Sequence, residues 1–389
     1  MGTDRWMSVG RGSAGAALDA AAAATRAAIA GDDPKLLIAF ASDALDLNET
    51  LRAIADAAPG VPLIGCSTAG EIATDGPGDA SVVVTAFGGA GFEVATAEAR
   101  NASSGLRDAG ATAAGCLREL SGDREHRILI LLTDGLAGDQ QEIVRGAYGV
   151  AGAGIPLVGG CAGDDLKMRA THQFHGSEVM QDAVVAAALA SDSPVGIGVR
   201  HGWRRVGEPM LVTQSEENRV IAIEDRPALD VYLERLEAPE AVRSDPEAFT
   251  RFASTHPLGL ASRRGEEHVR FVSGADFEER AIVCIAEVPR GALTWFMEGD
   301  DDSVLAATDA ACDDALAALG DRRPLGMLAF DCIARRGVLG EQGIRQEIER
   351  VAARGQGAPV AGFYTYGEIA RTRGISGFHN QTLVVLAVS

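Results

Sequence analysis

The stretch PLIGCSTAGEI, residues 62–72, carries the pattern on which the fold depends. It reads as a short apolar strand that ends in small polar residues, followed by a Gly-Glu step. The pattern returns as PLVGGCAGDD at residues 156–165 and as PVAGFYTYGEI at residues 359–369. Each copy has a proline, an apolar strand, and a glycine followed by an acidic residue. Such copies indicate one structural unit that is used repeatedly.

An apolar segment of strand length and a helical segment precede each copy. The strand segments are KLLIAFASD (35–43), RILILLTDG (127–135) and PLGMLAFDC (324–332). The helical segments are LNETLRAIADAAPGV (47–61), DQQEIVRGAYGVAG (139–152) and EQGIRQEIERVAARG (341–355). Two strands separated by a helix are parallel when they are neighbours in one sheet, so the sequence predicts three parallel pairs.

The spacing of the prolines favours a duplicated unit. Pro62, Pro156, Pro257 and Pro359 are separated by 94, 101 and 102 residues. This spacing predicts a repeat of roughly 100 residues. Pro257 belongs to HPLGLASRRGEE (256–267), which we interpret as a degenerate fourth copy because it lacks the preceding strand and helix.

The segments between the copies resemble antiparallel strands. The predicted hairpins are ASVVVTAFGG (80–89) with GFEVATAEA (91–99), DAVVAAALAS (182–191) with PVGIGVRHGW (194–203), and ERAIVCIAEV (279–288) with GALTWFMEG (291–299). QTLVVLAVS (381–389) is the last predicted strand. The fold class that follows is α/β, with mixed parallel and antiparallel sheets built from βαβ-type repeats and arranged in two lobes.

Charge and cysteine content restrict the partners and the compartment. The chain of 389 residues has 35 basic and 55 acidic residues, a formal net charge of −20. So acidic a surface repels nucleic acid and anionic lipid headgroups, and no apolar run is long enough to span a bilayer. Neither nucleic acid nor a membrane is therefore an expected partner. The six cysteines form no C-x-x-C pair, and without a recognisable export signal we expect free thiols and a cytoplasmic protein.

Five motifs in a fixed order point to a family. They are GCSTAGEI (65–72), HGW (201–203), DRPAL (225–229), YGEIA (366–370) and HNQT (379–382). With them the chain resembles the FIST family (F-box and intracellular signal transduction) over nearly its whole length. The resemblance implies an N-terminal and a C-terminal domain, for which we take residues 1–228 and 229–389.

The resemblance also implies a function. It implies a sensory module that binds small molecules such as amino acids. Some members are haem proteins that sense nitric oxide and act on a histidine kinase or on a cyclic-di-GMP enzyme. No kinase, cyclase or F-box segment is visible in this sequence, so the output is expected to need a separate signalling protein.

Polar and aromatic side chains at the ends of the predicted strands form the candidate ligand site. The first copy offers Cys66, Ser67, Thr68, Gly70 and Glu71, the second Cys161 and Asp164, and the third Tyr364, Tyr366, Gly367 and Glu368. Ligands of α/β proteins bind where strands end at the carboxyl edge of the sheet. The set supplies hydroxyls, aromatic walls and an anion for an ammonium group. The alternative is a turn that packs the repeats together, with both glutamates bonded to backbone amides or helix ends.

Two histidines extend this site. His201 ends a predicted strand, and His379 with Asn380 begins the last one. If haem binds, each histidine is a candidate iron ligand; otherwise each is a candidate hydrogen-bond donor to a carboxylate. A half-buried structural histidine is the alternative for both. No metal site and no other cofactor is expected.

Two further patterns favour other functions. GRGSAG (10–15) matches the dinucleotide pattern G-x-G-x-x-G, but the acidic residue expected about 20 residues later is missing. A glycine-rich entry to a helix is the alternative. Cys66 or Cys161 would serve a thiol-dependent hydrolase or transferase if a histidine activated it. No fixed spacing supports that pairing, and we expect a non-catalytic sensor.

Overall fold

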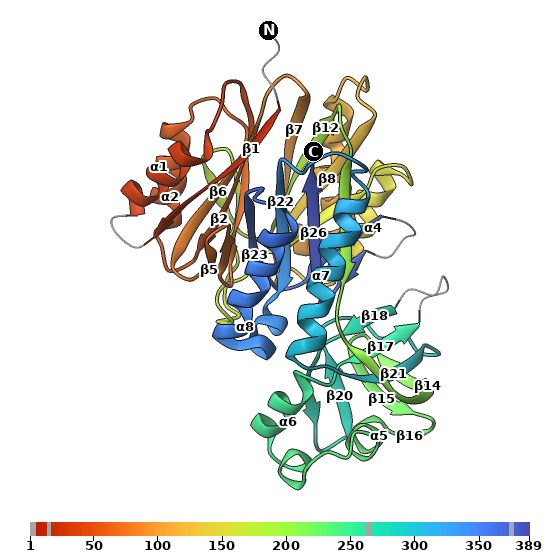
Figure 1. Cartoon of the computed structure of the whole chain (residues 1–389). Coiled ribbons are helices and arrows are strands. Elements are labelled where there is room, and N and C mark those ends of the chain that lie inside the picture. The colour runs from red at the N-terminus through yellow and green to blue at the C-terminus, as the bar shows by residue number, and fades with distance from the viewer. Residues whose placement is uncertain (1–4, 14–16, 262–266, 373–376) are drawn as a thin grey trace.

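The structure is a computed structural model, and it describes residues 5–13, 17–261, 267–372 and 377–389. Within these residues the strands form four sheets, three of six strands and one of eight. Figure 1 shows the three six-stranded sheets in one body, with the fourth sheet at its lower end. The predicted α/β class with mixed sheets is confirmed.

The first sheet contains β1 (Trp6–Ser13), β6 (Ser81–Gly88), β2 (Pro34–Ser42), β3 (Leu63–Thr68), β10 (Gln173–His175) and β11 (Glu178–Met180), in this spatial order. The second contains β25 (Phe378–His379), β24 (Glu368–Arg371), β9 (Leu157–Cys161), β8 (His126–Thr133), β12 (Ala183–Ser191) and β7 (Phe92–Arg100). The third contains β13 (Val195–Arg200), β26 (Leu383–Val388), β22 (Gly326–Cys332), β23 (Val360–Thr365), β4 (Glu71–Ala73) and β5 (Gly76–Gly78).

These three sheets share one arrangement. Each has a parallel pair at its centre: β2 with β3, β8 with β9, and β22 with β23. Two long antiparallel strands flank the pair on one side, and two short antiparallel strands flank it on the other. The predicted parallel pairs are therefore confirmed, while the duplication of a unit of roughly 100 residues stays a prediction.

The short strands are exchanged among the sheets. β4 and β5 follow the parallel pair of the first sheet but extend the third, where β4 pairs with β23. β10 and β11 follow the pair of the second sheet but extend the first, where β10 pairs with β3. β24 and β25 follow the pair of the third sheet but extend the second, where β24 pairs with β9. Each sheet thus gives one pair of strands and receives another, in a closed cycle.

An apolar core fills the space between the three sheets. Side chains alternate between the two faces of a strand, so Leu36, Ile38 and Phe40 of β2 reach this core while Leu37 and Ala39 face helices. Phe40 of the first sheet stacks on Phe363 of the third, with ring centroids 4.8 Å apart. The core therefore joins the sheets instead of belonging to one of them.

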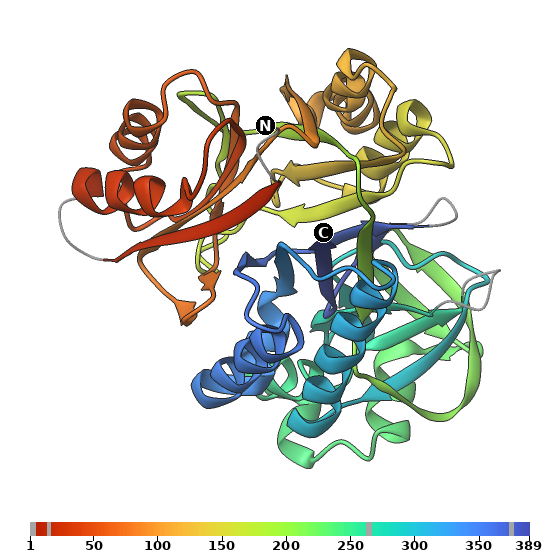
Figure 2. The same cartoon turned by 45° about the horizontal axis from the view of Figure 1, so that its top comes forward.

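Two helices cover the outer side of each sheet. They are α1 (Ala17–Ala28) and α2 (Leu47–Ala57) on the first, α3 (Leu106–Ala113) and α4 (Gln140–Ala151) on the second, and α7 (Asp301–Ala317) and α8 (Ile333–Arg354) on the third. The short 3-10 helices η1 (Ala102–Ser104) and η2 (Ala114–Glu119) flank α3. Figure 2 shows the three layers of sheet and helices around the C-terminus. We call this assembly the three-sheet body.

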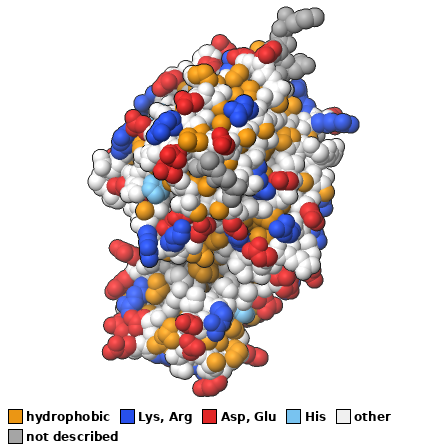
Figure 3. Space-filling view, turned by 90° about the vertical axis from the view of Figure 1, so that its left-hand side faces the viewer, with side chains coloured by type: hydrophobic (Ala, Val, Ile, Leu, Met, Phe, Trp, Pro, Cys, Tyr) orange, Lys and Arg blue, Asp and Glu red, His pale blue; other side chains and the backbone are white. Residues whose placement is uncertain are grey.

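Residues 204–298 form an insertion between β13 and α7, which we call the inserted domain. Its sheet contains β18 (Glu267–Arg270), β17 (Leu258–Ala261), β21 (Leu293–Glu298), β14 (Arg204–Glu216), β15 (Arg219–Ile223), β20 (Ala281–Cys284) and β19 (Val272–Asp276), with β16 (Arg226–Pro227) beside β15. Its helices are α5 (Ala228–Arg235), η3 (Glu240–Arg243) and α6 (Pro246–Ala253). It has its own core, in which the Tyr232 and Phe296 rings meet at 5.1 Å. Figure 3 shows it from the side, below the broader body.

The three predicted hairpins are wrong. β6 and β7 lie in the first and second sheets, and β12 and β13 lie in the second and third. β20 and β21 share the inserted sheet, but β15 and β14 separate them. At the turn signals between these strands the chain changes sheets or skips strands. The hairpin predictions are wrong because a turn signal does not identify the partner of a strand.

The predicted degenerate fourth copy contains no parallel pair in its described part, and its status as a repeat stays a prediction. Its described part forms β17, which pairs in antiparallel fashion with β18 and β21. Residues 262–266 of that segment lie outside the described residues.

The described glycines of GRGSAG serve packing. Gly10 and Gly12 lie in β1, where an added Cβ would come within 2.0 Å of Ala24 O and 2.2 Å of Ala20 O in α1. Ala14 and Gly15 of the motif lie outside the described residues. Close contact between a strand and a helix accounts for the described glycines without a dinucleotide.

The exchange of strands predicts that residues 1–228 do not fold alone. In this fragment β4 loses its partner β23, β9 loses β24, and β13 loses β26. Unpaired strand edges and a bare apolar face promote aggregation. We expect the purified fragment to aggregate in size-exclusion chromatography, and co-expression with residues 229–389 to recover a complex of the two pieces. A monomeric fragment with a cooperative melting transition would contradict the exchange.

Candidate functional site

The three motif copies meet where the chain passes from each sheet to the next. The segments are residues 67–70, 161–163 and 364–367, which we call the crossing. Backbone hydrogen bonds join them in a ring: Gly163 N–H to Ser67 O at 3.0 Å, Ala69 N–H to Tyr364 O at 3.1 Å, and Cys161 N–H to Gly367 O at 2.8 Å. The copies therefore come together, but they do so through their backbones.

Glu71 is fully buried beside the crossing. The Thr68 hydroxyl donates to one carboxylate oxygen. The other oxygen accepts from Ser81, at 2.6 Å from the hydroxyl and 3.1 Å from the backbone N–H. Burial raises the pKa of this carboxyl to about 7, against the opposing effect of the hydrogen bonds from Ser81 and Thr68.

Glu368 repeats this arrangement in the third copy. Thr365 Oγ1 donates to its Oε1 at 2.5 Å, and the Thr382 N–H donates to its Oε2 at 3.2 Å. Burial raises the pKa of Glu368 to about 8. Both glutamates thus tie the end of one strand to the start of the strand that follows the exchanged pair. This matches the packing alternative of the sequence analysis.

Gly70 and Gly367 each make the turn into an exchanged strand, β4 and β24 respectively. Gly70 has a φ of 113° and Gly367 a φ of 154°, values that side chains disfavour. An added Cβ would lie 2.2 Å from Arg336 Nη1 at the first position and 2.4 Å from Phe378 Cε2 at the second. Each Gly-Glu step is therefore a sharp turn followed by a buried glutamate, whose carboxyl group is held by hydrogen bonds.

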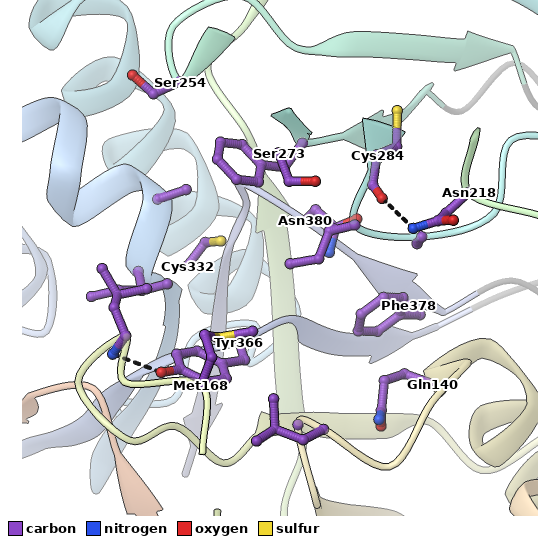
Figure 4. Close-up of a pocket in the computed structure, with 18 of the residues that line it drawn as sticks. Gln140, Met168, Asn218, Ser254, Ser273, Cys284, Cys332, Tyr366, Phe378 and Asn380 are labelled. Atoms are coloured by element: carbon purple, nitrogen blue, oxygen red, sulfur yellow. Dashed lines mark hydrogen bonds between the residues drawn. The ribbon is translucent and has the colours of Figure 1, made fainter. Parts of the chain in front are cut away.

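A cleft of about 950 Å³ lies between the three-sheet body and the inserted domain. Its body side consists of Gly135, Leu136, residues 138–140, Leu166, Met168, Cys332, Ile333, Ala334, Gly337, Tyr366, Phe378 and Asn380. Its other side consists of Glu217, Asn218, Thr250, Arg251, Ser254, Phe271, Ser273 and residues 284–287. Figure 4 shows Asn380 between the two sides. The body side lies at the carboxyl ends of β8, β9, β22 and β23, where α/β proteins bind ligands.

Tyr366 fixes the loop between β9 and β10 against the crossing. Its hydroxyl donates to Asp164 and accepts from the Leu166 N–H at 2.7 Å. The Asp164 carboxylate also accepts from the N–H groups of residues 168–170 at 2.7–3.0 Å. The cleft wall at this point is therefore held rigidly by hydrogen bonds.

The rim of the cleft is unusually apolar. Seven large apolar side chains are exposed in the described part of the chain, and four of them, Leu136, Leu166, Met168 and Ile285, line the cleft. Leu166 is 62% exposed and Met168 is 55% exposed. The sequence analysis missed these residues. Their signal is an apolar pair inside the polar loop GDDLKMR, residues 163–169.

Apart from the two histidines, the predicted site residues divide into two groups. Tyr366 and Asn380 line the cleft. The crossing and its surroundings enclose Cys66, Ser67, Thr68, Gly70, Glu71, Cys161, Asp164, Tyr364, Gly367 and Glu368. None of this second group lines the cleft, so their role as ligand contacts stays a prediction.

The two predicted histidines lie outside the cleft lining. The Trp203 N–H donates to His201 Nδ1 at 3.0 Å, which places the proton of a neutral ring on Nε2. His379 Nε2 lies 3.0 Å from Ala370 O, so this nitrogen carries the proton that it donates. The Nδ1 atom of His379 is then the unprotonated nitrogen that iron needs, because a ligating histidine commonly donates its other N–H to a carbonyl. Neither histidine is among the residues that line the cleft, so haem ligation stays a prediction.

The thiols do not fit the role of nucleophiles. All six cysteines are buried and free. Burial raises the pKa of every one of them, to about 11 for Cys116 and well above the usual range for Cys66. A reactive cysteine needs a lowered pKa and access to solvent. The described residues also hold no group of three or more His, Cys, Asp or Glu side chains suited to a metal ion.

Comparisons with known proteins agree with the two halves of the chain. A model of the FIST N domain matches residues 35–226, and a model of the FIST C domain matches residues 228–371. An uncharacterized protein of Methanocaldococcus jannaschii is 26% identical over 154 residues, which are 38% of this chain and 30% of that protein. Across the described residues, every helix is too short or too polar to cross a bilayer. The boundary between the two matches falls inside the inserted domain.

Glu368 predicts a pH dependence of stability. The folded state holds a proton on this carboxyl up to about pH 8, whereas the unfolded chain releases it near pH 4.5. The stabilisation is therefore complete below about pH 4.5 and is lost as pH rises through about 8. We expect the free energy of unfolding of the wild type, relative to Glu368→Gln, to fall between pH 5 and 8. The slope would reach at most about 1.4 kcal/mol per pH unit.

Urea unfolding at each pH measures this difference. Glu349→Gln removes an exposed carboxylate from α8 and controls for the change in net charge. A difference between the wild type and Glu368→Gln that stays constant from pH 5 to pH 8 would contradict the raised pKa.

Proposed function

The chain belongs to the FIST family, and we propose that it is a sensory module that binds a small organic ligand in the cleft and signals through a separate protein. FIST domains are sensory domains of signal transduction. The cleft is the observation that carries the proposal, because its volume of about 950 Å³ lies in the range of small-molecule sites. A cytoplasmic location is part of the proposal.

The connection between the two lobes supports a sensing movement. Only residues 201–203 and 299–300 link the inserted domain to the body along the described chain, and they lie side by side because Arg204 pairs with Glu298. Gly202 has a φ of 85°. An added Cβ on Gly299 would lie 2.4 Å from Trp203 Cε3, so the two linkers pack directly on each other. We infer that this joint is the hinge.

The hinge side chains also contact the body. Trp203 Nε1 donates to Gln381 O at 3.0 Å, and Gln381 Nε2 donates to Ser254 O of the inserted domain at 2.7 Å. The HGW and HNQT motifs thus meet at the joint between the lobes. This position gives both motifs a role in setting the angle of the inserted domain.

Ligand binding would favour closure of the cleft. A ligand shifts the equilibrium only by the difference between its affinities for the open and closed forms. Closure over a ligand would bury the four apolar rim residues, and burial of apolar surface contributes about 25 cal/mol per Å². The closed form would then present a changed surface to the partner. A histidine kinase or a cyclic-di-GMP enzyme is the partner class proposed from the family.

The proposal predicts that a neutral fluorescent probe occupies the cleft. PRODAN is an uncharged naphthalene dye whose emission shifts to the blue in apolar surroundings. We expect a saturable blue shift near one equivalent of dye, and we expect Ser273→Trp to weaken dye binding because the indole occupies part of the cleft. Ser273 is exposed in β19 and lines the cleft.

Ser104→Trp is the matched control, since Ser104 is exposed on the body and does not line the cleft. Both variants should keep the melting temperature of the wild type within a few degrees. If PRODAN binds the wild type and Ser273→Trp equally well, the dye is elsewhere and the cleft is not the ligand site.

A further inference from the structure

We infer that the cleft accepts a neutral or cationic amphipathic molecule, with an apolar body and an N–H or O–H donor, and discriminates against anions and zwitterions. This inference rests on the proposed function, since it defines the ligand of the same cleft. It departs from the expectation of a free amino acid, which carries a carboxylate. Three observations support it.

The first observation is an unpartnered acceptor. Asn380 lines the cleft and is 1% exposed, and its Oδ1 has no hydrogen-bond partner among the described residues. A buried amide oxygen without a donor is costly to the protein. An amide oxygen accepts and does not donate, so the missing partner is a donor group. A ligand N–H or O–H would satisfy it.

The second observation is the charge of the cleft. Its charged lining residues are three acids, Asp139, Glu217 and Glu287, and one base, Arg251. The Arg251 side chain is 72% exposed and lies 3.9 Å from Glu247. Figure 3 shows further acidic side chains gathered on the inserted domain. Like charges repel within such a cleft, so an anionic ligand is disfavoured.

The third observation is the apolar lining. The four exposed rim residues Leu136, Leu166, Met168 and Ile285 surround a cleft that also contains the aromatic rings of Phe271 and Phe378. An aromatic or branched apolar body matches this surface. A small, fully polar molecule would leave these side chains exposed and gain little from closure.

Four indoles of similar size test the inference as competitors of bound PRODAN. They are tryptamine, which is a cation, tryptophol, which is neutral, tryptophan, which is a zwitterion, and indole-3-propionate, which is an anion. We expect tryptamine and tryptophol to displace the dye at concentrations at least about tenfold lower than tryptophan and indole-3-propionate. Displacement is read as the return of PRODAN emission to its value in buffer.

Variants separate the two recognition elements. Asn380→Ala should weaken the binding of tryptamine and of tryptophol by about tenfold. Asn48→Ala, at an exposed position of α2, should leave the affinity for both compounds unchanged. The double variant Glu217→Gln and Glu287→Gln should reduce the preference for tryptamine over indole-3-propionate. Glu240→Gln, whose side chain is 94% exposed in η3, is its control. Melting temperatures confirm that each variant is folded.

The outcomes distinguish the two proposals. If PRODAN does not bind in the cleft, the proposed function fails. If PRODAN binds there but indole-3-propionate displaces it as well as tryptamine does, the ligand class is wrong while the sensory role stands. The same conclusion follows if no indole displaces the dye below millimolar concentration, or if Asn380→Ala leaves the affinity for tryptamine and tryptophol unchanged.

Discussion

The crossing is the constraint on which the rest of the structure depends. At this point three segments from distant parts of the chain exchange backbone hydrogen bonds, and each leaves its own sheet to extend another. Each sheet of the body includes two short strands that come, in the sequence, directly after the parallel pair of another sheet. Glu71 and Glu368 fix the turns by accepting hydrogen bonds inside the protein, and their burial explains why glutamate stands there without facing solvent. The body is therefore one cooperative unit, although the family models divide the chain within the inserted domain.

The location of the cleft follows from this arrangement. Parallel strands of all three sheets end at the crossing, and those of the second and third sheets end at the cleft, which the loop that holds Leu166 and Met168 also lines. The inserted domain leaves the body at β13 and rejoins it at α7, so it covers the same end. A rigid wall, fixed by the bond between Tyr366 and Asp164, then faces a lobe attached by two adjacent linkers. A sensor needs this combination, because ligand binding changes the angle between two parts only if each part keeps its shape.

The sequence predicted the elements better than their partners. Apolar runs on either side of a helical segment identified the three parallel pairs, since this order allows few other topologies. The partners of β6, β12 and β20 could not be predicted, because alternating side chains define the faces of a strand and not its neighbours. The sequence left open whether the motif copies converge; they meet through their backbones, and the packing alternative for Glu71 matches the structure. The cleft could not be predicted, because Ser273 and Asn380 face each other only after the inserted domain has packed on the body.

Native-state hydrogen exchange of the crossing amides tests the central claim most directly. The amides of Ala69, Cys161 and Gly163 donate the bonds that join the three segments, whereas the Gly291 amide donates to Val212 O within the inserted domain. If the body is one unit, the three crossing amides exchange only through global unfolding and share one opening free energy. Gly291 is then expected to exchange at an equal or lower free energy. Opening free energies for Ala69 and Cys161 that differ by more than about 1 kcal/mol would show that the sheets open separately and would contradict the account.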